Sequence, residues 1–390
     1  MHAPAGIGQK GLVHPLVRRT LLVTNDFPPR AGGIQSYLLA LAQRLPADRL
    51  VVYAPSWPDA AEFDARQPFP IFRHPSSLML PGDAVRARAI ELIREHRIGA
   101  VWYGAAAPLG LLTPALRAEG IGRTVACTHG HEVGWSMLPG ARRALRRIGR
   151  TNDVLTFVSR YARRRISAAL GPTAALEYLP PGVLAETYRP DPQARRVIRE
   201  RYGIGDAPLV LSVSRLVARK GQDALLRAVA RVRRTTPDVR TLIVGDGPDR
   251  GRLASLIGRL ELERQVLLVG SVPWADLPAH YAAADVFAMP CRTRGFGLDV
   301  EGLGLVFLEA SASGLPVVAG RSGGAPETVR EGRTGMVVDG RNIAELADAV
   351  GGLLADPDRA TAWGADGRDW VRRAWNWQSS ADRLAGLLSG

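Results

Sequence analysis

Short apolar runs recur along this chain in two groups of five, with amphipathic helical patterns between them, for instance over residues 33–45 and 85–96. Each run has only four or five residues, which is typical of a strand buried on both faces of a parallel sheet. The alternation of strand and helix predicts an α/β fold with helices on both faces of each sheet. The runs cover residues 20–24, 50–53, 100–103, 124–127 and 154–157, and then 209–213, 241–245, 266–269, 286–289 and 316–319.

A stretch rich in proline and glycine, residues 180–192, separates the two groups of runs. Such residues break regular structure, so we expect a linker and a hinge at this point. The length of 390 residues also favours two domains over one. We therefore predict two doubly wound, Rossmann-like domains that face a central cleft. The expected divisions are a disordered extension (1–19), a first domain (20–182), a second domain (183–371) and a terminal helix (372–390) that packs back onto the first domain.

Cysteine usage and hydropathy exclude several classes of protein. The chain has two cysteines, Cys127 and Cys291, so a disulfide framework is excluded. Neither has a second Cys or His at metal-ligand spacing, and we predict neither a metal site nor a cofactor. No apolar stretch reaches the roughly 20 residues that span a bilayer, and residues 1–19 lack the apolar core of a signal peptide. We expect a cytoplasmic protein.

Positive charge is concentrated in the first part of the chain. The whole sequence has 51 basic and 37 acidic residues, and residues 1–180 hold 23 of the basic and 12 of the acidic ones. Within residues 142–165 only Asp153 opposes nine arginines. A solvated surface is one interpretation, but an arginine-rich face also suits anionic lipid. We expect peripheral binding to the anionic inner face of the plasma membrane rather than to nucleic acid, with shallow insertion of Trp135, Met137 and Leu138.

Two loops that follow predicted strands have the composition of an anion site. Ligands of doubly wound sheets bind at the carboxyl ends of the strands. Gly32 and Gly33 stand just before a predicted helix, where free amides attract anions and glycine allows close approach. Arg215 and Lys220 follow the first strand of the second group. An arginine and a lysine at one strand end can together clamp a diphosphate. Lys220 stands out because the chain has only two lysines.

A third loop combines glycines with two glutamates, in the run Glu301-Gly-Leu-Gly-Leu-Val-Phe-Leu-Glu309. Eight helical steps would leave Glu301 and Glu309 about 80° apart around one helix. We therefore place Glu301 in the loop and Glu309 one to two turns into the helix. The amides of Gly304, Leu305 and Val306 would then form a helix N-terminus suited to a phosphate. Glu301 would accept hydrogen bonds from sugar hydroxyls and Glu309 from ribose hydroxyls.

These motifs and their order resemble those of the retaining glycosyltransferases of the GT-B fold, the large fourth family that includes mannosyltransferases and sucrose and glycogen-type synthases. The resemblance covers about residues 20–385. It is carried by Arg215-x4-Lys220-Gly, Val-Gly-Asp-Gly-Pro248, Ala-Asp-Val286, Glu301-Gly-x-Gly-x4-Glu309-Ala, Gly-Leu-Pro-Val-Val318 and Gly-Gly-x-Pro-Glu327.

Further strings resemble one group within that family, the actinobacterial α-1,6-mannosyltransferases that use GDP-mannose and phosphatidylinositol monomannoside in phosphatidylinositol mannoside biosynthesis. These strings are Thr24-Asn-Asp-Phe-Pro-Pro-Arg30, Gly32-Gly-Ile-Gln-Ser-Tyr37, Arg73-His-Pro-Ser-Ser-Leu-Met-Leu-Pro81, Thr128-His-Gly-His-Glu-Val-Gly-Trp-Ser-Met-Leu-Pro139 and Met289-Pro-Cys-Arg-Thr-Arg294.

The resemblance implies a role for each matching position. Arg215 and Lys220 would hold the diphosphate from the second domain, and Gly33 would contact it from the first. His129 and Glu301 would lie at the donor mannose, and Glu309 would bind the ribose. The remaining positions are the backbone near Val272, which would face the guanine, and Asp26 and Gln35, which would lie on the acceptor side.

Three alternatives remain open on the sequence. A glycosyltransferase of the same fold with another lipid or soluble acceptor is the nearest. A nucleotide-sugar epimerase shares the fold and needs no acceptor. A catalytically silent protein that binds membranes or nucleic acid is the third, although its donor motifs would then have no purpose.

Overall fold

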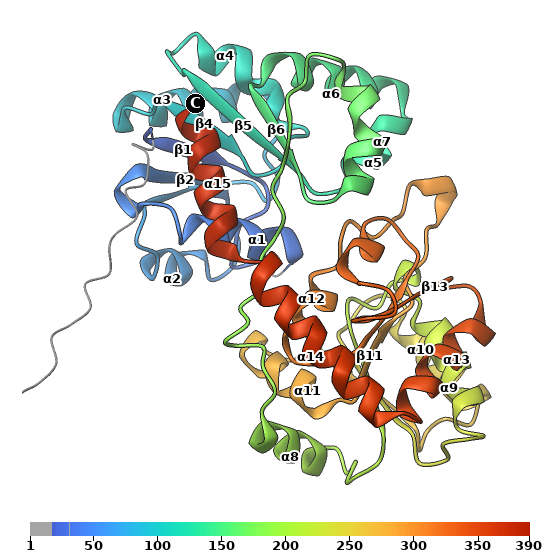
Figure 1. The fold of residues 1–390 in the computed structure, drawn as a ribbon. Coiled ribbons are helices and arrows are strands. Elements are labelled where there is room, and N and C mark those ends of the chain that lie inside the picture. The colour runs from blue at the N-terminus through green and yellow to red at the C-terminus, as the bar shows by residue number, and fades with distance from the viewer. Residues whose placement is uncertain (1–17, 31) are drawn as a thin grey trace, which may run out of the picture.

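The computed structural model describes residues 18–30 and 32–390, and the predicted extension lies almost entirely outside this part of the chain. Two α/β domains, each built on a parallel sheet, lie one above the other in Figure 1. This architecture confirms the prediction of two doubly wound domains. Among the described residues, no helix has both the length and the apolar character needed to cross a bilayer.

The first domain contains a seven-stranded parallel sheet with the strand order β3-β2-β1-β4-β5-β6-β7. The strands are β1 (Thr20–Val23), β2 (Leu50–Pro55), β3 (Ile71–His74), β4 (Ala100–Tyr103), β5 (Arg123–Thr128), β6 (Val154–Phe157) and β7 (Leu176–Tyr178). The edge strands β3 and β7 have no counterpart among the predicted apolar runs. Their side chains are only partly buried, so their sequences do not need to be uniformly apolar.

The second domain contains a six-stranded parallel sheet with the order β10-β9-β8-β11-β12-β13. The strands are β8 (Leu209–Val213), β9 (Arg240–Val244), β10 (Val266–Gly270), β11 (Val286–Met289), β12 (Val317–Gly320) and β13 (Gly335–Val338). In each sheet the strand order reverses in the middle, between β1 and β4 and between β8 and β11. A reversal of this kind opens a crevice at the carboxyl ends of the strands, where ligands bind.

Amphipathic helices connect the strands and bury their apolar sides on the sheets. In the first domain they are α1 (Gly33–Ala42), α2 (Ala60–Ala65), α3 (Asp83–His96), α4 (Thr113–Arg117), α5 (Glu132–Met137), α6 (Pro139–Thr151) and α7 (Arg160–Leu170). The second domain has α8 (Pro192–Arg201), α9 (Gln222–Val232), α10 (Arg250–Arg259), α11 (Leu277–Ala283), α12 (Leu305–Ala312), α13 (Ile343–Leu354) and α14 (Pro357–Ala374). The 3₁₀ turns η3 (Ala218–Lys220), η5 (Gly295–Gly297) and η6 (Ala325–Thr328) lie in loops.

The end of the chain crosses back from the second domain to the first, as Figure 1 shows. The predicted helix 372–390 differs from the structure, which has a break between α14 and α15 (Trp377–Ser389). Asn376 causes this break because its side chain caps α15 by accepting hydrogen bonds from two amides of the first turn. Trp375 is buried in the core of the second domain, whereas Trp377 is buried in that of the first. The chain before the break is thus anchored in the second domain, and the chain after the break is anchored in the first.

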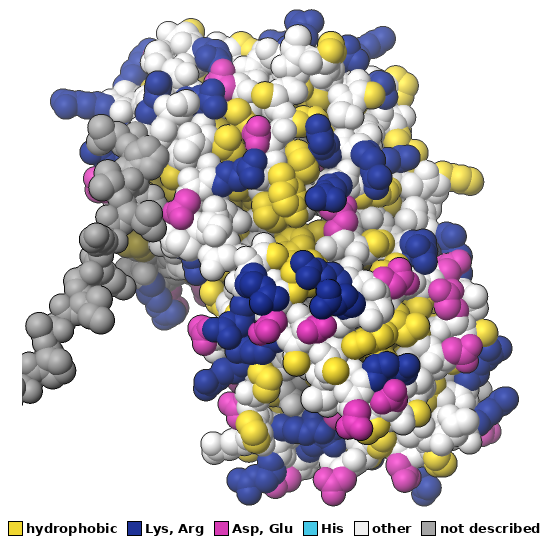
Figure 2. Space-filling model, in the orientation of Figure 1, with side chains coloured by type: hydrophobic (Ala, Val, Ile, Leu, Met, Phe, Trp, Pro, Cys, Tyr) yellow, Lys and Arg dark blue, Asp and Glu magenta, His cyan; other side chains and the backbone are white. Residues whose placement is uncertain are grey.

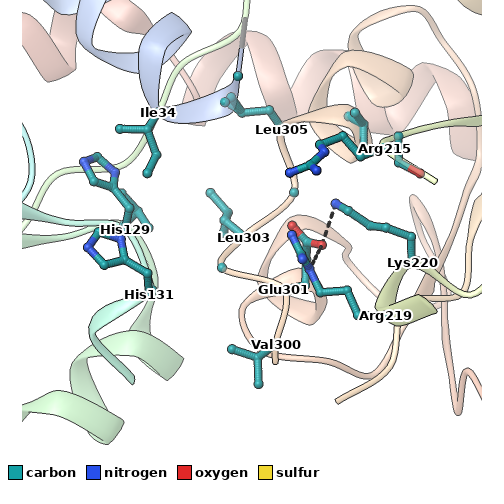
Figure 3. A pocket seen from close by; sticks show the side chains of 18 of the residues that line it. Ile34, His129, His131, Arg215, Arg219, Lys220, Val300, Glu301, Leu303 and Leu305 are labelled. Atoms are coloured by element: carbon teal, nitrogen blue, oxygen red, sulfur yellow. Dashed lines mark hydrogen bonds and ion pairs between the residues drawn. The ribbon is translucent and has the colours of Figure 1, made fainter. Parts of the chain in front are cut away.

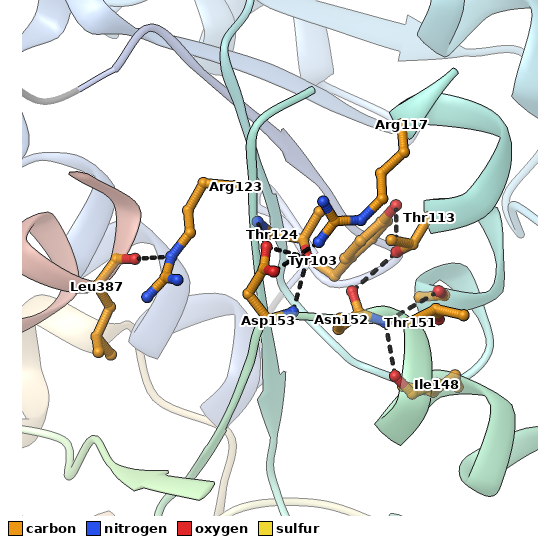
Figure 4. A network of polar contacts seen from close by, with 11 residues as sticks. Tyr103, Thr113, Arg117, Arg123, Thr124, Ile148, Thr151, Asn152, Asp153 and Leu387 are labelled. Atoms are coloured by element: carbon orange, nitrogen blue, oxygen red, sulfur yellow. Dashed lines mark hydrogen bonds and ion pairs between the residues drawn. The ribbon is translucent and has the colours of Figure 1, made fainter. Parts of the chain in front are cut away.

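A polar network at the amino ends of β5 and β6 fixes this part of the first sheet (Figure 4). Asp153 accepts hydrogen bonds from the Thr124 amide at 2.7 Å and from the Arg117 guanidinium at 2.6 Å. Arg123 donates from Nε to the Leu387 carbonyl at 2.8 Å, which ties α15 to the same place. The strand that leads to His129 is therefore held at its start by contacts to two other elements.

Candidate active site

A cleft of about 520 Å³ opens between the two domains, beyond the carboxyl ends of β5 and β8. This volume falls within the range of about 300–1,000 Å³ that small-molecule sites occupy. Figure 3 shows side chains of the first domain on one side and those of the second on the other. Most of the predicted site residues line the cleft, namely Gly33, His129, Arg215, Lys220, Glu301, Gly304, Leu305 and Val306.

Three cations from one loop form part of the second-domain wall. Arg215 comes two residues after the end of β8, and Arg219 and Lys220 lie in the turn η3. Within the described residues Lys220 is the one lysine, and its side chain is only 11% exposed. Like charges so close together in a concave, partly desolvated site produce a strong positive potential. The loop is therefore arranged to attract an anion.

Glu301 partly neutralises this loop. Lys220 donates from Nζ to Glu301 Oε2 at 2.6 Å, and Arg219 Nε lies 3.9 Å from the same oxygen. The Glu301 backbone is also held in place, because its carbonyl accepts a hydrogen bond from the Gly324 amide at 3.0 Å. A buried ion pair is tolerated only when each charge has a close partner. A ligand that carries both phosphate and hydroxyl groups can replace this pair, because its phosphate can bind Lys220 while its hydroxyl groups donate to Glu301.

The N-terminus of α12 opens onto the same cleft. Gly304 stands immediately before the helix with a φ of 90°, in the left-handed region that glycine adopts without strain. Leu305 and Val306, the first two residues of the helix, line the cleft. Amides in the first turn of a helix have no intrahelical partner and form the positive end of the helix dipole. The predicted phosphate-binding amides thus share one cleft with the three cations.

The first-domain wall centres on His129, directly after β5. Its Nε2 lies 2.7 Å from the Gly104 carbonyl, which can only accept, so the ring proton is on Nε2 and Nδ1 carries the lone pair. Burial lowers the pKa of the His129 imidazole, which keeps it neutral near pH 7. Glu132 is fully buried behind this loop, and its carboxylate accepts hydrogen bonds from the His129 and Gly130 amides at 3.0 and 3.1 Å. This carboxylate fixes the loop that presents the histidine.

The two domains touch beside the cleft. A Cβ added at Gly302 would lie 2.6 Å from the His129 carbonyl oxygen, so only glycine allows this backbone approach. Nearby, the carboxylate of Glu327 in η6 accepts hydrogen bonds from the Arg160 and Tyr161 amides of α7, both at 2.9 Å. A side chain of the second domain therefore binds the first turn of a helix of the first, and the two domains are in direct contact beside the cleft.

The other predicted site residues, Glu309, Val272, Gln35 and Asp26, are not among the residues that line the cleft. Glu309 is the fifth residue of α12, where Tyr281 Oη donates to its carboxylate at 2.8 Å and burial raises its pKa to about 7. Val272 packs against the core of the second domain. Gln35 donates from Nε2 to Asp26 Oδ1 at 3.0 Å, so these two predicted acceptor-side residues contact each other. Their roles stay predictions.

Sequence reasoning missed four residues that shape this site. Arg219 and His131 line the cleft, whereas Glu132 and Glu327 act from behind it. Arg219 was detectable as a further cation beside Lys220. Glu132 was detectable as a carboxylate shortly after a predicted strand. Glu327 ends the motif Gly-Gly-x-Pro-Glu327, but its role had no local signal because its partners lie 166 and 167 residues away.

Two doubly wound domains that face a cationic cleft form the architecture of the GT-B glycosyltransferases. Residues 31–187 match the model of "Glycosyltransferase Family 4", and residues 194–370 match that of "Glycosyl transferases group 1". A crystal structure of Anabaena HepE in complex with UDP has the same fold, with a TM-score of 0.81, 20% identity and coverage of 95% of this chain and 99% of that one.

Sequence relatives identify a particular group of glycosyltransferases to which the chain is similar. The chain is 58% identical to the "GDP-mannose-dependent alpha-(1-6)-phosphatidylinositol monomannoside mannosyltransferase" of Mycolicibacterium smegmatis, over 95% of this chain and 98% of that protein. It is 45% identical to the "GDP-mannose-dependent monoacylated alpha-(1-6)-phosphatidylinositol monomannoside mannosyltransferase" of Corynebacterium glutamicum, with the same coverage of both chains. The chain belongs to this family of mannosyltransferases, which confirms the resemblance inferred from its motifs.

Proposed function

We propose that this chain transfers mannose from GDP-mannose to phosphatidylinositol monomannoside with formation of an α-(1-6) linkage. The observation that carries the proposal is the convergence of Arg215, Arg219, Lys220 and the N-terminus of α12 on one interdomain cleft. The family names of the full-length relatives supply the identity of the donor and the acceptor.

The cationic loop acts on the leaving group. As the bond between the anomeric carbon and the phosphate breaks, negative charge grows on the diphosphate. Arg215, Arg219 and Lys220 already line the cleft before this happens, so they stabilise the charge as it develops. Lys220 moves only a short distance from Glu301 to the diphosphate, which frees the Glu301 carboxylate to accept hydrogen bonds from mannose hydroxyls.

The first domain closes the site over the reacting sugar. His129, neutral and fixed by the Gly104 carbonyl and by Glu132, lies at the mannose. The reaction retains the anomeric configuration. We favour attack from the face of the leaving group, with a donor phosphate oxygen as the base for the acceptor hydroxyl. Closure about residues 180–192 and the break before α15 excludes water, which would otherwise hydrolyse the donor.

Membrane contact belongs to the same proposal. Five of the nine arginines of residues 142–165 lie on α6, and all of these five side chains are exposed. In Figure 2 basic side chains far outnumber acidic ones on the visible face of the first domain, whereas the two are mixed on the second. Anionic lipid attracts such a surface by about 1 kcal/mol per basic residue close to it. Flotation with anionic vesicles should show binding that weakens with salt, and binding indifferent to lipid charge would contradict this part.

Transfer itself is tested with purified protein, GDP-mannose and phosphatidylinositol monomannoside in detergent micelles. Mass spectrometry should detect one added hexose that an α-1,6-specific mannosidase removes. Arg215→Ala should lower turnover about 100-fold or more, because one preorganised charge at the leaving group is lost. Arg227→Ala is the matched control, since Arg227 is an exposed arginine on α9 outside the cleft.

Each alternative function has its own result in this assay. Faster transfer from another nucleotide sugar, or to a different acceptor, would replace the proposed substrates. An altered nucleotide sugar formed without acceptor would indicate an epimerase. Wild-type transfer by Arg215→Ala would refute the role of the cationic loop, and failure to bind GDP in calorimetry would refute an enzyme that uses this donor.

A further inference from the structure

A tight hairpin of the second domain, residues 294–299, holds a phenylalanine out in solvent. Two backbone hydrogen bonds close the hairpin, from Arg294 N to Asp299 O at 2.9 Å and from Asp299 N to Arg294 O at 3.2 Å. Phe296 at its tip is fully exposed and has a φ of 54°. The left-handed region is unfavourable for a bulky side chain, so this conformation is held by the closed hairpin around it. An aromatic ring presented in this way points to a partner.

The hairpin reaches the first domain beside α5 and α7, where apolar side chains of both domains are exposed. A Cβ at Gly134 in α5 would lie 3.9 Å from Leu298, and one at Gly297 would lie 3.2 Å from Arg165 Nη2. The same Arg165 nitrogen lies 3.6 Å from Met137 Sδ. We call the four exposed apolar residues here the junction patch: Met137 (40% exposed), Leu138 (56%), Phe296 and Leu298 (51%).

Exposed arginines of both domains lie beside the junction patch. They are Arg165, which contacts Met137, Arg142, whose amide donates to the Leu138 carbonyl, and Arg294 at the base of the hairpin. An apolar centre with a cationic rim matches the boundary between the acyl chains and the anionic headgroups of a bilayer, where aromatic rings insert and arginines reach the phosphates. The rim is continuous with the basic face of α6 and α7, which also favours a lipid surface over a protein partner.

We propose that the junction patch inserts into an anionic bilayer and that Phe296 is a membrane anchor carried by the second domain. This inference rests on the proposed function, which requires a lipid acceptor. Because Met137 and Leu138 belong to the first domain, the patch is complete only when the domains are closed. When both domains contact the membrane, closure of the cleft is therefore favoured while the lipid acceptor is still in the bilayer.

The insertion is measured with a polarity-sensitive fluorophore on the variant Phe296→Cys. Both native cysteines are buried, so the label reacts at the new site. Vesicles with anionic phospholipid should brighten the label and shift its emission to the blue, and lipids with a quencher near the headgroup should dim it. The control is Ser255→Cys, an exposed position on α10 of the same domain, whose label should not respond. An unresponsive label at residue 296, on protein that floats with the vesicles, would overturn the proposal.

A second variant separates this inference from the proposed function. Phe296→Ser should weaken vesicle binding about tenfold, because one aromatic side chain no longer leaves water. It should slow transfer to an acceptor embedded in vesicles and leave transfer to a short-chain acceptor in detergent unchanged. Equal vesicle binding by the variant and the wild type would overturn the role of Phe296 as an anchor. A label at residue 296 that brightens with protein concentration in the absence of lipid would overturn it too, because the partner of this residue would then be a second copy of the chain. Absence of transfer to the detergent-soluble acceptor by the wild type would instead refute the proposed function.

Discussion

Replacing Glu309 with glutamine should stabilise the folded protein at alkaline pH and at the same time weaken its binding of GDP. Burial raises the pKa of this carboxyl from its ordinary value of 4.5 to about 7, and Tyr281 Oη donates to it at 2.8 Å. Glutamine keeps the size of the side chain and an acceptor for the tyrosine, but it has no charge to desolvate. The substitution therefore isolates the cost of the buried charge.

The size of the effect follows from the two pKa values. Between pH 4.5 and pH 7 the folded state binds more protons at this group than the unfolded state, so the free energy of unfolding falls as the pH rises. The full shift corresponds to about 3 kcal/mol at pH 8. Glu309 retains some exposure to solvent, so we expect about 1.5–3 kcal/mol.

Urea unfolding of wild type and Glu309→Gln at pH 4.5, 6 and 8 measures this effect. The variant should gain stability relative to wild type as the pH rises. The control Glu263→Gln, which changes an exposed glutamate of the same domain, should keep a constant difference from wild type. A difference for Glu309→Gln that does not change with pH would refute the reasoning. In calorimetry GDP should bind wild type more tightly at pH 8 than at pH 6, because only the ionised carboxylate accepts from both ribose hydroxyls. Equal affinity of the variant and wild type at pH 8 would remove Glu309 from the ribose site.

Three further changes test the closed cleft and its charges. Lys220→Arg should lower kcat about tenfold in the transfer assay, because a planar guanidinium does not fit the 2.6 Å contact to Glu301; unchanged kcat would contradict this. Gly302→Ala places a Cβ 2.6 Å from the His129 carbonyl oxygen, so turnover should fall by up to about 100-fold while GDP binding persists; wild-type turnover would show that full closure is not required. Glu327→Ala removes the two hydrogen bonds that this carboxylate accepts from the first turn of α7, worth about 1 kcal/mol. X-ray scattering should then show a more open free protein; identical scattering curves would show that these bonds do not hold the domains together.

Much of the secondary structure was predictable because buried parallel strands have to be apolar. The ten apolar runs correspond to ten strands with boundaries that agree within two residues. Three of the four edge strands, β3, β7 and β13, were not predicted, because β3 and β7 are only partly buried and the short β13 begins with a glycine. The break in the C-terminal helix had a readable signal in Asn376, a good helix N-cap, but the tryptophans around it favoured one continuous helix.

The sequence alone determined the two-domain α/β architecture, the cationic loop and the glycine-rich start of α12, because each depends on residues close together in the chain. Only the tertiary structure decided which of these features face one another. Lys220 meets Glu301 across 81 residues, and the Glu327 carboxylate reaches α7 across more than 160. Contacts of this kind leave no periodic trace, since they depend on how two separately folded sheets are held together. The junction patch could not be predicted from the sequence for the same reason, because its apolar residues become neighbours only when the two domains come together.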